Sequence, residues 1–405
     1  MRVYPRHHLD LTVGHLLYAA LACCRRADSD RLGRSILAHG ARADGIVCFS
    51  VRSGFELLLD ALQLRPGSEV VVSAITHPDM VRIIERHGLR SVAVDIDSAT
   101  LAPRLDVLNE AITSRTRAIL VAHLFGSRFD VGPVAETARR HGLLLLEDCA
   151  QSLRGPGDSG YPGADVAMFS FGSIKTCPAL GGAIFYVRDE SVRARMEASQ
   201  AAWPRQPRLA YLKRVAWFAG LLVLGEPTIF GAFVRAAALF GADLEQLVNA
   251  SIHAVRPPSA ADEERFAIWL RHRPSIPMLA LLERRFRRFD AERLRLRTQR
   301  GEELLERLPR AFTPGHAADL RTHWVFPVAV DEPEELARVL RKKGFDTTSP
   351  TSIAAIDSSD GARPVTAHDL MARVVFVPAY PELPRRARQR LVAALESHVE
   401  GNTGR

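Results

Sequence analysis

Lysine is scarce in this chain of 405 residues, where it occurs four times against fifty arginines. The lysines are Lys175, Lys213, Lys342 and Lys343. Chemistry that needs a side-chain amine therefore has few places where it could occur. The net charge is +8. The arginines are scattered among acidic residues rather than gathered in one tail or stripe, and this pattern argues against nucleic-acid binding.

Cysteine pairs and long apolar runs are also missing. None of the five cysteines stands in a CxxC pair: they are Cys23, Cys24, Cys48, Cys149 and Cys177. We therefore expect a reduced, cytoplasmic protein. No apolar run reaches the roughly 20 residues that a membrane-spanning helix needs. The apolar stretch 11–24 contains His15 and no small-residue cleavage pattern, so we expect an amphipathic helix there rather than a signal sequence.

From about residue 45, short apolar runs alternate with stretches of helical period. The apolar runs are 69–73, 91–96, 118–124, 143–148, 166–171 and 183–187, and the helical stretches are 54–64, 78–87, 104–113 and 131–141. Buried strands separated by helices predict an α/β fold with a mostly parallel sheet covered on both faces. A smaller α+β unit is expected near the end of the chain, with strands at 323–330 and 373–378 and helices at 334–343 and 384–399.

We predict three parts: a large domain at 1–200, an apolar helical insertion at 201–258 and a small domain with its connecting helices at 259–405. In the insertion, residues 215–225 carry no charge, and the apolar pattern resumes after Gly225-Glu226-Pro227. One explanation is a pair of helices buried against the body or a subunit partner. The other is a hairpin over 215–241 that touches a membrane surface, with Lys213 and Arg214 near the headgroups.

Reactive side chains follow two neighbouring strands of the predicted sheet. One strand ends on Glu147-Asp148, and the next is followed, after Ser170, by Lys175. Ligands of such sheets bind beyond the carboxyl ends of the strands, so Asp148 and Lys175 should face one crevice. Pyridoxal 5'-phosphate chemistry requires this pair, since a lysine forms the Schiff base and a carboxylate keeps the pyridine nitrogen protonated. A surface lysine and a helix-capping aspartate are the alternative.

A series of motifs in the same order resembles the DegT/StrS family of sugar aminotransferases, which use pyridoxal phosphate and have the aspartate aminotransferase fold (fold type I). The matching stretches are 53–59, 66–70, 94–97, 122–126, 147–151, 169–175 and 375–381. The resemblance implies a homodimer that transfers an amino group from glutamate or glutamine to a keto-sugar, nucleotide-linked or related. It implies no metal.

The resemblance also implies roles around the cofactor ring. Lys175 would hold the cofactor as a Schiff base and move protons at the substrate carbon. Asp148 would pair with the pyridinium nitrogen, and Gln151 would lie near the phenolic oxygen. His77 would stack on the ring, with helix capping or a core position as the alternative.

Further roles concern the cofactor phosphate. Ser170 would bond to it, and the backbone amides of Gly54 and Phe55 would cradle it at the start of a helix. Arg271 would replace the asparagine that, in the family, reaches the phosphate of the neighbouring subunit.

Two alternatives to this function stay open. The apolar insertion favours an enzyme at the membrane surface that acts on a lipid-linked acceptor. Phe55 and Ile174, which stand where the family has hydroxyl side chains, favour a non-catalytic regulatory relative.

Overall fold

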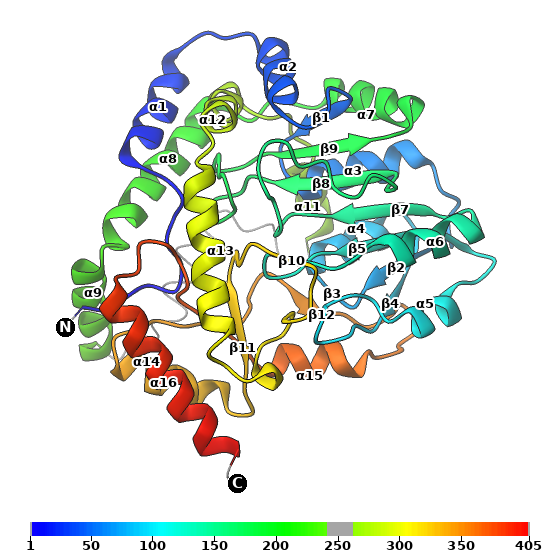
Figure 1. The fold of residues 1–405 in the computed structure, drawn as a ribbon. Helices are drawn as coiled ribbons and strands as arrows, with labels where there is room; N and C mark the ends of the chain where they lie inside the picture. Colours follow the sequence, from blue (N-terminus) through cyan, green and yellow to red (C-terminus); the bar gives the residue numbers. More distant parts are fainter. Residues whose placement is uncertain (1, 241–261, 404–405) are drawn as a thin grey trace.

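A seven-stranded sheet forms the centre of the computed structural model, which describes residues 2–240 and 262–403 (Figure 1). Its strand order is β1-β9-β8-β7-β5-β2-β4. The strands are β1 (Gly45–Cys48), β2 (Glu69–Ser73), β4 (Arg90–Val94), β5 (Thr116–Ala122), β7 (Leu144–Asp148), β8 (Val166–Ser170) and β9 (Ala183–Val187). All neighbours pair in parallel except β9, which runs antiparallel to both β8 and β1. The predicted α/β class is confirmed; strand β1, at the edge, was not anticipated.

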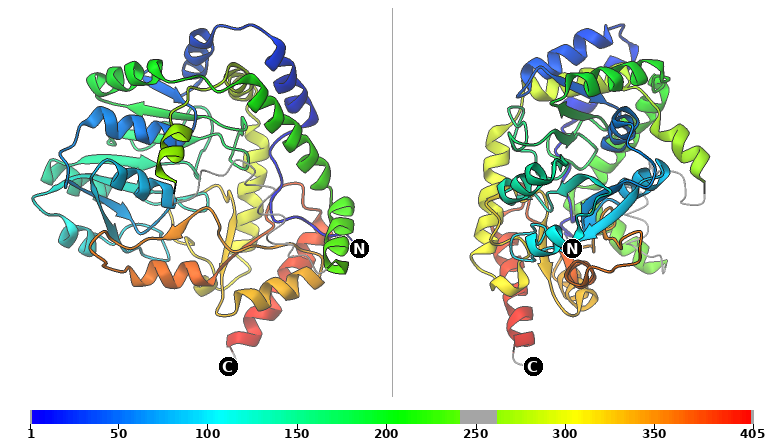
Figure 2. Two further views of the ribbon diagram at one scale, coloured as in Figure 1. Left: turned by 180° about the vertical axis from the view of Figure 1, so that it is seen from behind. Right: turned by 90° about the vertical axis from the view of Figure 1, so that its right-hand side faces the viewer.

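Helices cover both faces of this sheet, because its strands are apolar on both sides (Figure 2). Val70 and Val72 of β2 face one layer, and Val71 between them faces the other. The first layer contains α3 (Val51–Leu62), α4 (Pro78–Arg86), α7 (Glu190–Ala202) and α11 (Glu263–Leu270). The second contains α5 (Leu105–Ala111) and α6 (Gly132–His141), and, over β8 and β9, α1 (Val13–Cys24), α2 (Ser29–His39), α8 (Arg208–Leu224) and α12 (Ile276–Arg287).

The smaller unit near the end of the chain is built on the antiparallel pair β11 (Phe326–Ala329) and β13 (Val374–Val377). Its helices are α14 (Pro333–Lys342), α15 (Val365–Arg373) and α16 (Arg385–Thr403), and α13 (Ala291–Leu305) leads into it. The four elements expected here are confirmed within a few residues. Short pieces link the parts of the chain: β3 (Ile75–Thr76) pairs with β12 (Ala354–Ala355), β6 (Ser127–Arg128) pairs with β10 (Leu320–Arg321), and η1 is Arg310–Phe312.

The inserted segment forms two helices, α8 and α9 (Pro227–Leu239), which meet at the expected break and are bent by 91°. Tyr211, Val215 and Phe218 of α8 are buried against the body, beside α1 and α12. The explanation by burial therefore holds for this face of α8. Within the described ranges, no single helix has the length and apolarity to cross a bilayer. Only α8 and most of α9 taken together reach that length and apolarity, and they are bent with respect to each other. The end of the expected insertion lies outside the described residues.

The segment that precedes α1 crosses from the smaller unit to the large one. Arg6 forms a two-pronged ion pair with Asp346, with nitrogen–oxygen distances of 2.6 and 2.9 Å, and both side chains are buried. The amide of Val3 donates to the carbonyl of Pro227 at the start of α9. This crossing segment therefore holds three parts of the chain together.

Candidate active site

A cavity of about 500 Å³ opens beyond the carboxyl ends of β5, β7 and β8, beside the first residues of α3 and α4. Five of the predicted site residues line it: His77, Asp148, Gln151, Ser170 and Lys175. They come from the start of α4, the ends of β7 and β8 and the loops after these strands. The structure thus brings together residues that are almost 100 positions apart in the sequence. Their individual roles stay predictions.

Lys175 and Asp148 influence each other's protonation in this cavity. Burial lowers the pKa of Lys175 to about 8; the Asp148 carboxylate opposes this shift and Arg52 adds to it. Burial raises the pKa of Asp148, while the amide of Ala150, which donates to its Oδ1 at 2.8 Å, and the charge of Lys175 act in the other direction. The lysine is therefore far closer to its neutral, nucleophilic form at physiological pH than an exposed lysine is.

The chain on both sides of Lys175 is held by hydrogen bonds. The carbonyl of Ile174 accepts from Trp324 Nε1 at 2.7 Å, and the ammonium of Lys175 lies 4.0 Å from the centre of the Trp324 ring. On the other side, Thr176 Oγ1 accepts from Arg297 Nη2 at 3.0 Å. These contacts limit the positions that the lysine can take.

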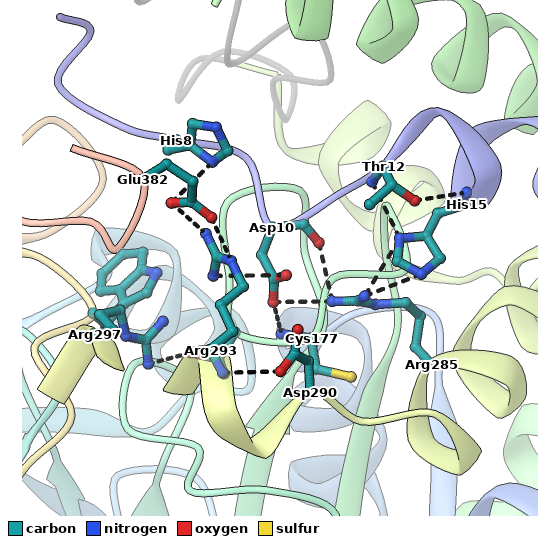
Figure 3. A network of polar contacts seen from close by, with 12 residues as sticks. His8, Asp10, Thr12, His15, Cys177, Arg285, Asp290, Arg293, Arg297 and Glu382 are labelled. Atoms are coloured by element: carbon teal, nitrogen blue, oxygen red, sulfur yellow. Dashed lines mark hydrogen bonds and ion pairs between the residues drawn. The ribbon is translucent and has the colours of Figure 1, made fainter. Parts of the chain in front are cut away.

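Asp10, from the segment before α1, contacts the loop that carries Lys175 (Figure 3). Its carboxylate accepts from the amide of Cys177 at 3.2 Å and pairs with Arg285 at 2.9 Å and Arg293 at 3.6 Å. Arg285 is only 5% exposed. Asp10 is thus a positioning residue that sequence reasoning missed, because nothing in its neighbourhood links it to Lys175, 165 positions away.

The start of α3 forms one wall of the cavity. Ser50 is the residue that precedes the helix, and its hydroxyl accepts from the amide of Ser53 at 3.1 Å. The first amides of a helix have no partner within it. Those of Val51 and Arg52 have no partner among the described residues, and they remain for a ligand. Both residues and Ser50 line the cavity. A helix start of this kind is a ready site for a phosphate group.

The prediction for Gly54 and Phe55 is wrong. The amide of Gly54 already donates to the carbonyl of Ser50 at 2.9 Å, because the helix begins at Val51. Phe55, one turn into α3, is fully buried in the core. The hydroxyl of Ser50 before an apolar helical stretch was the signal that could have placed the helix start correctly.

Two arginines stand in the cavity wall where the sequence gave no hint of them. Arg52 pairs with Asp79 at 2.8 Å and lies over the Trp269 ring, 4.6 Å from its centre. Arg214 of α8 donates from Nη1 to the carbonyl of Leu180 at 2.6 Å. The membrane explanation, which placed Arg214 near the headgroups, therefore does not hold for this residue, because it lines the cavity.

His77 both borders the cavity and caps a helix. Its Nδ1 accepts from the amide of Asp79 at 3.1 Å, directly before Pro78 opens α4. The capping alternative is confirmed, and stacking on a cofactor ring stays a prediction. With Nδ1 as the acceptor, the proton of the neutral ring is on Nε2.

Gln151 and His123 complete the wall next to Asp148. Gln151 Oε1 accepts from the amide of Phe125 at 2.9 Å, which fixes the side-chain amide. His123 Nε2 lies 2.8 Å from Glu147 Oε1, while its Nδ1 is buried and has no hydrogen-bond partner among the described residues. His123 is a further site residue that sequence reasoning did not single out.

Arg271 does not line the cavity. Its Nη2 pairs with the buried carboxylate of Glu56 in the same chain at 3.0 Å. A contact between Arg271 and the phosphate of a neighbouring subunit stays a prediction. Thr351, Ser352 and Ile353 also border the cavity.

The likeness to known proteins agrees with this geometry. The model of the DegT/DnrJ/EryC1/StrS aminotransferase family matches the chain from residue 28 to residue 204, a range that contains Asp148 and Lys175. The matched range is less than half of the chain. The resemblance seen in the sequence is confirmed over that range.

Named relatives and solved structures extend the comparison. A UDP-N-acetyl-3-dehydro-alpha-D-glucosamine 3-aminotransferase from Acidithiobacillus ferrooxidans is 33% identical over 161 residues, which are 39% of this chain and 42% of the relative. The aminotransferase TlmJ from Streptoalloteichus hindustanus has a TM-score of 0.69 at 18% identity, with 99% of both chains covered. NtdA from Bacillus subtilis, solved with the cofactor PMP bound, has a TM-score of 0.67 at 15% identity, with 96% of this chain and 83% of NtdA covered. The described part of the chain therefore has the fold type I architecture, while the sequence match spans less than half of the curated relative.

Proposed function

We propose that this protein is a pyridoxal-phosphate-dependent aminotransferase that moves an amino group from glutamate or glutamine to a keto-sugar. The observation that carries the proposal is the meeting of Lys175 and Asp148 in one cavity, with the pKa of the lysine lowered to about 8. The family match over residues 28–204 supports the reaction, and the UDP-sugar in the name of the relative supports a nucleotide-linked acceptor.

The residues present fit pyridoxal phosphate. Its carbonyl needs an amine, which Lys175 offers, and its ring nitrogen needs a carboxylate, which Asp148 offers. Its phosphate needs an anion site, which the start of α3 offers with Ser170 in the same wall. His123 Nδ1, which has no hydrogen-bond partner in the described ranges, is a further polar atom that a bound group would satisfy. Bound there, pyridoxal phosphate would accept the electrons left on the substrate carbon when a proton departs.

The side chains in the cavity wall each have a separate role in the proposed reaction. Lys175, neutral in a substantial fraction of molecules near pH 8, takes a proton from the substrate carbon and returns it. Asp148 keeps a positive charge at the ring nitrogen. Gln151, whose amide is fixed by the backbone of Phe125, orients the phenolic side of the ring. The loop 351–353 borders the same cavity and is the part of this wall that we assign to the acceptor.

Reductive trapping tests the proposal. Purified protein is mixed with pyridoxal phosphate, reduced with borohydride, digested and examined by mass spectrometry, with Lys175→Ala and Lys213→Ala alongside. The adduct is expected on the peptide of Lys175 in the wild type and in Lys213→Ala, and absent from Lys175→Ala. An adduct on another lysine contradicts the assignment. A wild type that takes up no cofactor supports the regulatory alternative instead.

A homodimer, as the resemblance implies, is part of this proposal. Sedimentation equilibrium of the purified protein measures it directly, and a mass near 90 kDa is expected, about twice the 44.7 kDa of one chain. A mass of one chain across the whole concentration range contradicts it.

A second candidate function, a cytoplasmic enzyme that touches a membrane and acts on a lipid-linked acceptor, rests on a separate observation. Three adjoining helices expose large apolar side chains: Val13, Leu17 and Leu21 on α1, Leu209, Trp217 and Val223 on α8, and Ile229 on α9. Basic residues accompany them at Arg25, Arg26 and Lys213, whereas Glu226 is the one acidic residue between 208 and 240. Exposed apolar side chains beside positive charge favour contact with anionic lipid.

Flotation with liposomes tests this second candidate. Vesicles with and without anionic lipid are mixed with wild type, with the double variant Leu17→Gln/Val223→Gln and with Val365→Gln. Val365 is a matched control, since it is 75% exposed on the distant helix α15. The wild type and Val365→Gln are expected to float with anionic vesicles, and the double variant to stay below. Equal behaviour of all three proteins contradicts membrane contact through these helices.

A further inference from the structure

Positive charge exceeds negative charge in the wall of the active-site cavity. Among the described residues of this wall, three cations face two carboxylates: Arg52, Lys175 and Arg214 against Asp79 and Asp148. Asp79 forms an ion pair with Arg52 at 2.8 Å, and the charge of Asp148 raises the pKa of Lys175. This leaves Arg214 without an acidic partner in the described part of the chain.

Arg214 is partly buried and is placed by its own helix. Its Nη1 donates to the carbonyl of Leu180, and its Nε is buried with no hydrogen-bond partner among the residues described. Its guanidinium also lies 6.0 Å from the centre of the Phe49 ring, at the residue before Ser50. Burial lowers the pKa of Arg214, and the charge of Arg52 adds to the shift. A cation that is desolvated next to a second cation is strongly stabilised by an anion between them.

The start of α3 belongs to the same cavity wall as this arginine. The amides of Val51 and Arg52 and the hydroxyl of Ser50 belong to the same cavity wall as Arg214. Helix-start amides and arginine side chains are both groups that bind phosphate in proteins. The inserted helix α8 therefore brings a cation to an anion site that the helix start already provides.

We propose that Arg214, with the start of α3, holds the phosphate of the cofactor, so that this chain's own inserted helix supplies a phosphate contact that the resemblance assigns to a neighbouring subunit. The inference rests on the proposed function, because it takes pyridoxal phosphate as the ligand. Arg271, the residue expected to reach across, is engaged by Glu56. The inserted segment thus has a role in cofactor binding.

Comparison of pyridoxal phosphate with pyridoxal, which lacks the phosphate, tests the proposal without an activity assay. Dissociation constants of both are measured by fluorescence titration for wild type, Arg214→Gln, Arg214→Lys and Lys213→Gln. Lys213 is the matched control, because it is the exposed cation next to Arg214 on the same helix. Melting curves of each variant establish that it is folded.

Arg214→Gln is expected to weaken binding of pyridoxal phosphate by about tenfold or more, as for loss of a hydrogen bond between charged groups, and to leave pyridoxal unchanged. Arg214→Lys should recover part of the loss, and Lys213→Gln should behave as wild type. Equal loss for both ligands means a structural role and overturns the proposal. Unchanged affinity for both ligands also overturns it.

Two further binding measurements distinguish the cofactor phosphate from other phosphate groups that could bind at Arg214. Uridine diphosphate represents the substrate, and if Arg214→Gln weakens only its binding, the arginine serves the acceptor and the proposal is overturned. Inorganic phosphate represents the anion alone, read as a rise in melting temperature. If the wild type fails to bind pyridoxal phosphate yet is stabilised by inorganic phosphate through Arg214, the anion site stands and the proposed function fails. A wild type that binds neither ligand refutes both.

Discussion

The lowered pKa of Lys175 gives a prediction with a defined size. Its value of about 8 lies about 2.5 units below the 10.5 of an ordinary lysine. At pH 7 roughly 10% of the amines are then neutral, against about 0.03% for an ordinary lysine, a ratio of about 300. Since only the neutral amine attacks a carbonyl or another electrophile, Lys175 should be by far the fastest lysine to react near neutral pH.

The scarcity of lysine makes this measurable residue by residue. The protein without cofactor is exposed briefly to trinitrobenzenesulfonate between pH 6 and 11, then digested, and the modified fraction of each lysine peptide is measured by mass spectrometry. The rate at Lys175 should rise with a midpoint near pH 8, with Lys213 as the reference in the same digest. A midpoint near 10.5 refutes the reasoning.

Asp148→Asn tests the physical cause. Because the Asp148 carboxylate raises the pKa of Lys175, its removal should move the midpoint below that of the wild type. Asp60→Asn removes an exposed carboxylate on α3 and should leave the midpoint unchanged. A midpoint that rises in Asp148→Asn contradicts the electrostatic account.

Three predictions concern stability. Asp10→Ala leaves the buried guanidinium of Arg285 with one ion-pair partner fewer and should lower the free energy of unfolding by about 3 kcal/mol, measured by urea denaturation; a loss under about 0.5 kcal/mol would show that the pair contributes little. Gly54→Ala places a new carbon 2.1 Å from the ring of Phe185 and should lower the free energy of unfolding by about 1–3 kcal/mol. Gly33→Ala, in open space on α2, should be neutral or stabilising. The same result for both variants would contradict the packing around Gly54. Burial would raise the pKa of Glu147, but hydrogen bonds and the neighbouring positive charges lower it from 4.5 to about 2. The resulting stabilisation, on the order of 3 kcal/mol, is complete above pH 4.5 and is lost as the pH falls through 2. Glu147→Gln should therefore flatten the dependence of the free energy of unfolding on pH over that window.

The sequence predicted elements best where a local signal marks their ends. Pro78 stands at the first position of α4, and the expected and observed starts agree. The start of α3 was expected at Gly54 from the helical period alone, while Ser50 supplies the actual cap. The edge strand β1 was missed because four residues carry too little period to identify a strand.

The predicted site was correct where residues end a strand and incomplete where they arrive from elsewhere. Asp148 is the last residue of β7 and Lys175 follows β8, so sheet geometry alone brings them together. Arg214 and Asp10 reach the site from an inserted helix and from the segment before α1. Helical period does not tell which neighbour a given face will meet, so neither contact could be predicted from the sequence.

The most direct test of the account is the absorbance spectrum of the purified protein after addition of pyridoxal phosphate, followed by glutamate, for wild type and Lys175→Ala. The account predicts that the wild type develops the absorption band of a cofactor joined to a lysine, and that glutamate replaces this band with that of the aminated cofactor. The Lys175→Ala variant should not form the first band. A wild type that forms no such band, or whose band neither glutamate nor glutamine changes, contradicts the central claim that Lys175 and Asp148 form the centre of an aminotransferase.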